Sequence, residues 1–99
     1  MAQVTLATVA RAIRKNGWKQ ITGDYVKRVN GKIVGACALG QAGLNLGVAG
    51  DDLERALNVY NDLGHAIIDW NDENKWTLDQ IAERIEKDWT PYLDEVIVV

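Results

Sequence analysis

A stripe of small residues in the segment GACALGQAGLNLG, residues 35–47, is the feature that most constrains how this chain folds. A glycine inside a helix costs about 1 kcal/mol relative to alanine, so several glycines on one side are expected only where another backbone comes close. Placing the segment on a helix at about 100° per residue brings four small residues onto one narrow side. We predict a packing groove there, with Gly64 of the next helix opposite. The four residues are Ala36, Gly40, Gly43 and Gly47.

Three further segments have the apolar spacing of amphipathic helices. The first follows Thr5, a residue type that caps helix starts. The second is predicted to run from an Asp51-x-x-Glu54 capping box to about Trp70. The third begins at a Thr77-x-x-Gln80 capping box and ends near Pro91. Together with the glycine-rich segment, the sequence predicts four helices.

The stretch YVKRVNGKIVG predicts a β-hairpin. Asn-Gly readily takes the positive φ angles of a type I′ turn, which places strands at about residues 25–29 and 32–34. Two strands alone are marginally stable, so the β-prone tail DEVIVV is expected either to add a third strand or to pair with another copy of the chain. The predicted fold class is α+β: one small domain over residues 1–99, with four helices, a short hairpin and a candidate C-terminal strand.

Composition favours a globular protein of the cytoplasm. Apolar residues make up 47% of the 99 residues and charged residues 25%, which is enough to form a core. No segment has the roughly 20 apolar residues that span a bilayer, and Arg11 and Arg14 interrupt any signal-peptide pattern at the start. A single cysteine forms no internal disulfide, so nothing indicates an oxidising compartment.

The charges are segregated along the chain. Residues 1–32 have a net charge of +6, whereas residues 33–99 have a net charge of −9. One interpretation is that the two parts attract each other within one fold; the others are head-to-tail self-association and a basic face for an acidic partner. The candidate basic face consists of Arg11, Arg14, Lys15, Lys19, Lys27, Arg28 and Lys32.

Four tryptophans and three tyrosines are many for so short a chain. Partly exposed aromatic side chains often anchor protein interfaces, and we take Trp18, Tyr25 and Trp70 as the candidate anchors. Trp18 and Tyr25 lie among the basic residues, where they would stack on nucleic-acid bases if the chain binds nucleic acid. The alternative is that these residues are core aromatics in a chain without phenylalanine.

Cys37, the only cysteine, is a candidate nucleophile because it lies near a predicted helix start, where a thiol pKa is lowered. His65 would be its base, oriented by Asp69 or Asn71. Because His65 and Asp69 lie on the polar face of their helix, whereas Cys37 lies in an apolar segment, we expect a buried structural cysteine and no catalytic residues.

Other kinds of site are not supported by motifs. The glycines match neither a Walker loop nor a dinucleotide-binding fingerprint. Asp62, His65 and Asp69 resemble metal ligands on one helix face, but DWNDEN lacks the glycine and the distant glutamate of a calcium loop. We expect no metal and no cofactor, and interpret DWNDEN as a solvated helix end.

Three segments, CALGQAG, AIIDWND and WTLDQIAERIEK, together resemble a family of small uncharacterised proteins of actinobacteria and their phages. The resemblance spans roughly residues 6–90, while ENKW and the tail DEVIVV depart from the pattern. Because that family has no established activity, the resemblance implies a shared fold and a phage origin but no mechanism. The matching positions are Cys37, Ala38, Leu39, Gly40, Trp70, Asn71, Asp72 and Thr77.

The sequence as a whole predicts a non-enzymatic accessory protein, encoded by a phage, that binds a host protein or forms a homodimer in the host cytoplasm. The alternative is a small nucleic-acid-binding regulator that uses the basic N-terminal part. A hydrolase based on Cys37 is a remote third reading. Membrane binding is not expected.

Overall fold

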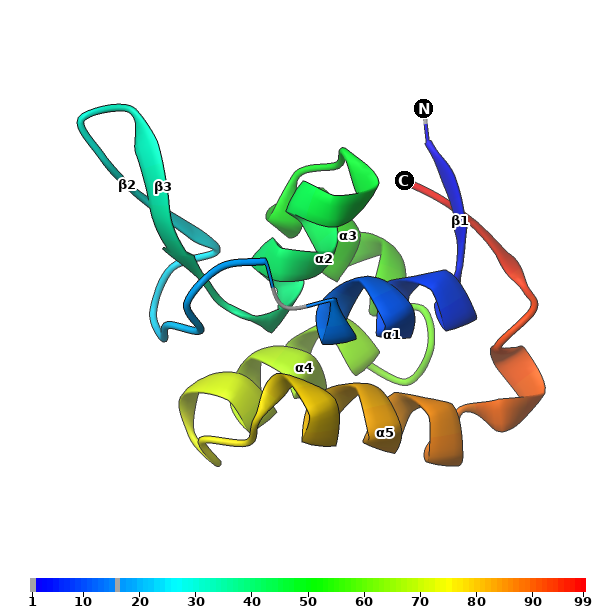
Figure 1. Cartoon of the computed structure of the whole chain (residues 1–99). Helices are drawn as coiled ribbons and strands as arrows, with labels where there is room; N and C mark the ends of the chain where they lie inside the picture. The colour runs from blue at the N-terminus through cyan, green and yellow to red at the C-terminus, as the bar shows by residue number, and fades with distance from the viewer. Residues whose placement is uncertain (1, 16) are drawn as a thin grey trace.

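The computed structural model describes residues 2–15 and 17–99, and shows an α+β fold (Figure 1). Within the described residues there are five α-helices and four strands, which form two separate two-stranded antiparallel sheets. In chain order the elements are β1 Gln3–Thr5, α1 Leu6–Arg14, β2 Val26–Val29, β3 Lys32–Ala36, α2 Ala38–Leu46, α3 Gly50–Leu57, α4 Leu63–Asp72, α5 Leu78–Asp88, the 3-10 helix η1 Thr90–Tyr92, and β4 Val96–Val98.

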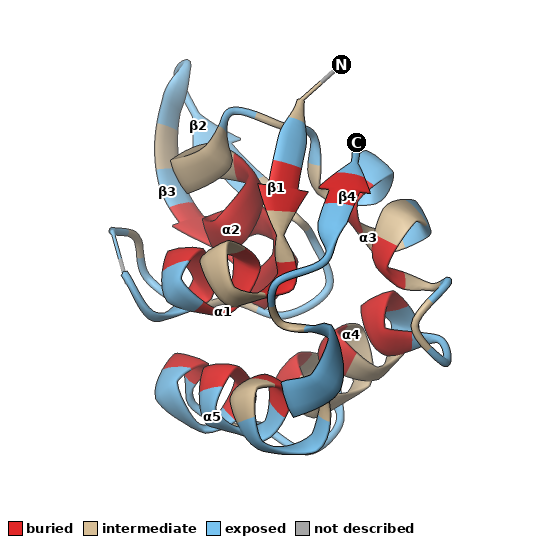
Figure 2. Cartoon of the chain, turned by 90° about the vertical axis from the view of Figure 1, so that its right-hand side faces the viewer, coloured by how far each residue is buried: buried red, intermediate tan, exposed pale blue. Residues whose placement is uncertain are grey.

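The core lies where the five helices meet, with α1 packed against both α2 and α5. The buried residues form stripes on the inner sides of the helices, and the terminal sheet adds Val4 and Ile97 (Figure 2). In the part of the chain that the structure describes, no helix is both long and apolar enough to cross a membrane. The largest buried apolar side chains are Leu6, Val9, Ile13, Leu39, Leu53, Leu57, Leu63, Ile67, Ile81 and Ile85.

Two helix starts are capped as the sequence predicts. The Thr5 hydroxyl accepts a hydrogen bond from the Thr8 amide at 3.2 Å, and the Thr5 amide donates to the Thr8 hydroxyl at 2.9 Å. At α5, the Gln80 amide donates to the Thr77 hydroxyl at 3.1 Å, and the Thr77 amide donates to the Gln80 side chain at 2.9 Å. Both boxes satisfy amides that have no partner inside the helix.

The predicted single helix from Asp51 to Trp70 is wrong, because the chain forms two helices there, α3 and α4. The break falls at Asn61 and Asp62, which both take positive φ angles, 59° and 57°. Asn and Asp adopt this left-handed conformation more readily than other residues with a side chain, and a helix cannot continue through it. The helix count is therefore five in the described residues, not four.

The predicted Asp51 capping box is also wrong. The residue before α3 is Ala49, which provides no side-chain hydrogen bond. Asp51 and Asp52 lie inside the first turn instead, where negative charge interacts favourably with the helix dipole.

The hairpin prediction is confirmed. Asn30 and Gly31 have φ angles of 52° and 79°, as a type I′ turn requires, and β2 pairs antiparallel with β3. The second strand extends to Ala36, beyond its predicted end, and the register shifts between Lys27 and Arg28. Figure 1 shows the hairpin tip projecting away from the helices.

The C-terminal strand does not extend the hairpin; it pairs with β1 at the other end of the chain. Gln3 lies opposite Val98, Val4 opposite Ile97, and Thr5 opposite Val96. The pairing follows from the pleat, since it turns Val4 and Ile97 together toward the core while Val96 and Val98 stay exposed.

The glycine stripe makes close backbone contacts, but not with Gly64. A Cβ on Gly40 would overlap the Tyr25 carbonyl oxygen, and one on Gly43 would lie 2.5 Å from the Val48 carbonyl oxygen. The neighbours are thus the root of the hairpin and the turn after α2. Gly64 lies against the Glu54 carbonyl of α3 instead, because the turn at Asn61 and Asp62 brings α4 back across α3.

The other two members of the stripe lie outside the helix. Ala36 ends β3, and its amide donates to the Lys19 carbonyl at 2.9 Å. Gly47 is the C-cap of α2 in the left-handed conformation, with a φ of 75° and open space where a Cβ would be. The helical groove predicted across residues 36–47 therefore reduces to Gly40 and Gly43.

Candidate functional site

The seven residues of the candidate basic face are all exposed, but they lie on separate elements. Two come from α1 and a third, Lys15, is its C-cap; three come from the β2–β3 hairpin, and Lys19 lies on the segment between. Figure 1 shows the hairpin tip well away from α1. The structure thus divides the basic face into two surfaces. The α1 group is Arg11, Arg14 and Lys15; the hairpin group is Lys27, Arg28 and Lys32.

The hairpin presents one outward face. Residues opposite each other on paired strands share a face, and Val29 lies opposite Lys32. Lys27, two residues before Val29 on β2, belongs to this same face by the period of two. All three side chains are exposed, with Val29 at 49%. We call Lys27, Val29 and Lys32 the hairpin face.

The root of the hairpin is fixed firmly to the helices. The Tyr25 carbonyl accepts a hydrogen bond from the Cys37 amide at 3.1 Å, directly beside Gly40. The Tyr25 hydroxyl donates to a Glu54 carboxylate oxygen on α3, and its ring lies against Gly50. Burial, together with this hydrogen bond, raises the pKa of Tyr25 to about 12. Tyr25 therefore acts as a neutral anchor inside the molecule, and not as a ring free to stack on a ligand.

Asn71 is the centre of a polar network that holds the segment before the hairpin. Its side chain is 1% exposed. The Asn71 Oδ1 accepts from the Ala38 amide at 3.1 Å and from the Gln20 side chain at 2.9 Å, and its Nδ2 donates to the Ile21 carbonyl at 2.8 Å. Asp72 adds a hydrogen bond from the Gly23 amide at 3.3 Å. Two of the resembling motifs, the one at Ala38 and the one at Asn71, thus meet in space.

The prediction that DWNDEN is a solvated helix end is therefore wrong for Asn71. Its burial follows from the helical period, because it lies four residues after the buried Ile67. In the sequence, the burial of Asn71 is indicated by its position on the apolar stripe of its helix. An amide group is suited to the position because it donates and accepts at once.

Gln41 is a second buried polar residue that motif analysis does not single out. Its Nε2 donates to the Trp18 carbonyl at 2.6 Å, and its Oε1 accepts from the Trp18 amide at 3.3 Å. This pair of bonds makes Gln41 a partner for the backbone of residue 18. Trp18, one of the candidate anchors, is half-buried.

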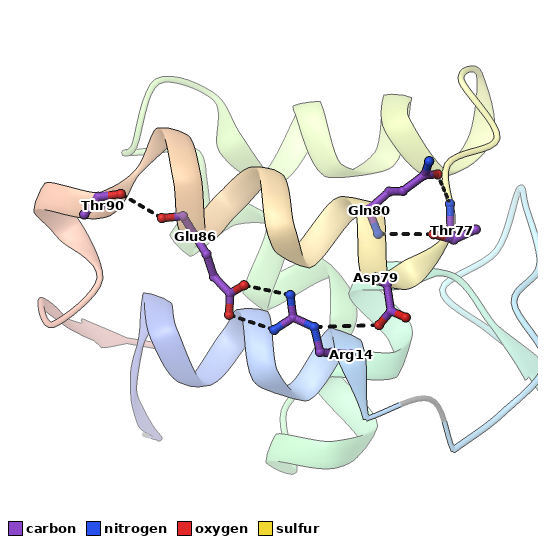
Figure 3. A network of polar contacts seen from close by, with 6 residues as sticks. All are labelled: Arg14, Thr77, Asp79, Gln80, Glu86 and Thr90. Atoms are coloured by element: carbon purple, nitrogen blue, oxygen red, sulfur yellow. Dashed lines mark hydrogen bonds and ion pairs between the residues drawn. The ribbon is translucent and has the colours of Figure 1, made fainter.

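Arg14 links the basic and acidic parts of the chain (Figure 3). Its guanidinium makes two parallel hydrogen bonds to the Glu86 carboxylate, at 2.8 and 2.7 Å, and lies 3.7 Å from Asp79. The hydrogen bond with Arg14 holds the pKa of Glu86 below its usual range, and the same bond raises the pKa of Arg14. At this contact, the basic residues 1–32 and the acidic residues 33–99 attract each other within the same molecule.

Trp70, the third candidate anchor, belongs to an aromatic cluster between α4 and α5. It stacks on Trp76 with ring centroids 5.2 Å apart and meets the edge of Trp89 at 6.1 Å. The Arg84 guanidinium lies 4.9 Å from the Trp76 ring centroid. These contacts account for the half-burial of Trp70 without a partner.

Cys37 and His65 are placed in different surroundings. Cys37 precedes α2 and is 5% exposed, and burial raises the pKa of its thiol, which disfavours the thiolate that a nucleophile needs. It forms part of the wall of a hollow that also contains Tyr25, Ile68 and Asp72, and His65 does not line that hollow. His65 is exposed and lies 3.4 Å from Asp69. Within residues 2–15 and 17–99, no three His, Cys, Asp or Glu side chains gather as metal ligands.

Comparison with known proteins found no family model that matches the chain, no similar curated protein, and no matching solved structure.

Proposed function

We propose that this chain is a non-enzymatic binding protein that docks onto an acidic protein surface through the hairpin face. The observation that carries the proposal is the projecting hairpin, on which Lys27, Val29 and Lys32 are all exposed to solvent. Two cations around an exposed valine match a partner surface with carboxylates around a small apolar patch.

The firm root supports this role. A binding arm loses less conformational entropy on association when it is held in place beforehand. Tyr25 and Gly40 fix the end of the hairpin that joins the helices, while the Asn71 network holds the segment that leads into it.

A duplex nucleic acid is the second candidate partner, and the same hairpin favours it. A two-stranded β-ribbon fits the DNA major groove, and Lys27, Arg28 and Lys32 would contact phosphates. Two observations disfavour nucleic acid. The chain has a net charge of −3, and the hairpin cations lie apart from those of α1. Of the α1 cations, Arg14 already binds Glu86.

The resemblance to proteins of actinobacteria and their phages supports a phage gene as the source, and we include this in the proposal together with a place in the host cytoplasm. A host protein is then the expected partner. Binding of a second copy of the chain is the alternative, since residues 33–99 carry a net charge of −9.

The test compares two double charge reversals that change the net charge equally. One converts Lys27 and Lys32 to Glu, and the matched control converts the exposed Lys75 and Lys87 to Glu. Affinity capture from host lysate, with quantitative mass spectrometry, should recover a protein with the wild type and the control that the hairpin variant loses. Direct binding of the purified partner then measures the affinity, which we expect to fall at least tenfold in the hairpin variant.

Three other results would contradict the proposal. Equal capture by the hairpin variant and the control would remove the hairpin from the interface. A concentration-dependent dimer by light scattering, abolished only in the hairpin variant, would identify a second copy as the partner. Salt-dependent binding of a DNA duplex, lost in the same variant, would favour the nucleic-acid alternative.

A further inference from the structure

A groove runs along α1 on a surface that the hairpin does not reach. Its wall on one side is the outer stripe of α1, with Thr8, Arg11 and Lys15, and on the other side the last turn of α2, with Asn45 and Leu46. The hollow has a volume of about 520 Å³. It continues past Thr8 and Leu46 into a second hollow that reaches Val96 of the terminal sheet. We call this continuous depression the α1 groove.

One end of the α1 groove is cationic. Arg11 and Lys15 lie four residues apart, so their side chains are neighbours on the helix, and Arg14 lies beside them. In the part of the chain that the structure describes, Arg14 pairs with Glu86 and Asp79, whereas neither Arg11 nor Lys15 forms an ion pair. Two like charges at this spacing destabilise a helix slightly, and a carboxylate placed between them would remove that cost.

The other end of the groove carries no charge, and its apolar side chains, Leu46 and Val96, lie beside polar Gln3 and Thr5. Leu46 is half-buried and Val96 is 62% exposed, while Ala12 is buried beneath the cationic end. The Asn45 side chain donates to the Ala12 carbonyl at 2.9 Å, which holds the wall in place between the two helices. The floor is thus preformed and has apolar surface available for contact.

We propose that the α1 groove binds an acidic amphipathic segment of a partner protein, with its carboxylates at Arg11 and Lys15 and its apolar side chains over Leu46 and Val96. Charge complementarity and the apolar floor select this occupant together. Two unpaired cations are too few for a nucleic-acid backbone, and a phosphate chain would leave the apolar end without contacts. The groove also has a direction, because its charged and apolar ends differ.

The probes are three synthetic peptides of twelve residues. The first has leucines at helical spacing and four glutamates near one end; the second replaces the glutamates with lysines; the third keeps the glutamates and replaces the leucines with serines. Titration of the uniformly ¹⁵N-labelled chain should shift the amide resonances of Thr8, Arg11, Lys15, Leu46 and Val96 with the first peptide only. A spin label at the acidic end should broaden Arg11 and Lys15 but not Val96.

The matched variants separate this groove from the hairpin. Converting Arg11 and Lys15 to Gln should weaken binding of the first peptide at least tenfold, whereas converting Lys27 and Lys32 to Gln should leave the affinity unchanged. Both pairs are exposed, and an unchanged amide spectrum outside the substituted region verifies that the fold is kept. The result is independent of the hairpin proposal, which is tested with a different surface.

Other outcomes would overturn the inference. If the serine peptide binds as well as the first, the interaction is one of charge alone and the groove has no role. Shifts confined to the hairpin, or broadening of Val96 by the label at the acidic end, would also exclude the proposed mode. Absence of binding at millimolar peptide would exclude this class of partner.

Discussion

The two sheets of this protein have the same number of strands and the same antiparallel pairing, yet they are stabilised in different ways. The β2–β3 hairpin is formed by neighbours in the chain, joined by the Asn30-Gly31 turn, and most of its residues are exposed. The β1–β4 sheet joins the two ends of the chain, and Val4 and Ile97 anchor it in the core. A tight local turn holds the first; burial holds the second.

The comparison shows that a sheet of this protein can stay paired even when most of its side chains are exposed to solvent. The hairpin can carry cations and exposed valines because its pairing needs little help from a core, apart from its root at Tyr25 and Gly40. The terminal sheet is only three residue pairs long and would not persist without the helices beneath it. The following experiments test this contrast, beginning with the largest expected effect.

Gly40→Ala should be the most damaging single change, because it disrupts the close approach between the α2 backbone and the hairpin root at Tyr25. The new Cβ would overlap the Tyr25 carbonyl, a backbone atom that can move only with the hairpin root. We expect a loss of about 3 kcal/mol or more in the free energy of unfolding, and a Tm lower by roughly 12 °C. Thermal and guanidinium unfolding measure both. Gly47→Asn is the control, since Gly47 has a positive φ that Asn tolerates and open space around it. Equal stability of the two variants would refute the close approach.

Ile97→Ala and Val29→Ala compare the two sheets directly. Ile97 is 5% exposed and Val29 49% exposed. Truncating the buried residue should cost about 2–4 kcal/mol, and truncating the exposed one less than about 0.5 kcal/mol. Denaturant titration of both variants provides the comparison. Val96→Ala, on the exposed side of the same terminal strand, should behave like Val29→Ala. If Ile97→Ala has no larger effect than Val96→Ala, the terminal sheet is not held by burial.

Gly31→Val should loosen the hairpin alone. Gly31 has a φ of 79°, which a β-branched residue adopts only with strain, at a local cost of about 1–2 kcal/mol. Amide hydrogen exchange should accelerate in β2 and β3, while exchange in α1 and α5 stays as in the wild type. Asn30→Gly keeps the turn geometry and serves as the control. Faster exchange throughout the molecule would mean that the hairpin is coupled to the core more tightly than its exposure indicates.

Glu86→Gln should have the smallest effect and depend on pH. Glu86 on α5 binds Arg14 on α1, so this ion pair ties together the helices adjacent to β4 and β1. Because the folded state lowers the pKa of Glu86, its contribution is present above the ordinary glutamate pKa and is lost as the pH falls through the folded value. Both side chains are about 40% exposed, so the wild type should exceed the variant by no more than about 1 kcal/mol at pH 7.

Unfolding measured between pH 7 and pH 2 tests this prediction. The stability difference between wild type and Glu86→Gln should disappear toward the acidic end. A constant difference across the range would assign the effect of Glu86→Gln to packing.

Local signals explain what the sequence could predict. The Asn30-Gly31 turn and the Thr5 and Thr77 caps each act within about four residues, so they can be recognised without knowledge of the fold. The division of residues 51–70 into two helices was missed because the apolar spacing continues through the break. Tyr60 is half-buried and keeps the period, while the left-handed Asn61 and Asp62 interrupt the backbone.

Nonlocal contacts explain what the sequence could not predict. Strands of three residues at opposite ends of the chain carry no signal for their partners, and the pairing of β1 with β4 depends on helices that lie between them. The basic residues of the candidate site could be identified by type, but their division between the hairpin and the α1 groove depends on where α2 and the hairpin lie. The burial of Asn71 was visible only as an amide on an apolar helical stripe.

The pairing of the two ends has one more consequence. The Ala2 amide donates to the Val99 carbonyl at 3.1 Å, and the Val99 amide donates to the Ala2 carbonyl at 2.8 Å. The backbone therefore almost closes on itself, and the fold is topologically close to a ring. A short linker between residues 2 and 99 would allow new ends at the exposed turn around Val59, and such a circular permutant should keep the helices and both candidate surfaces.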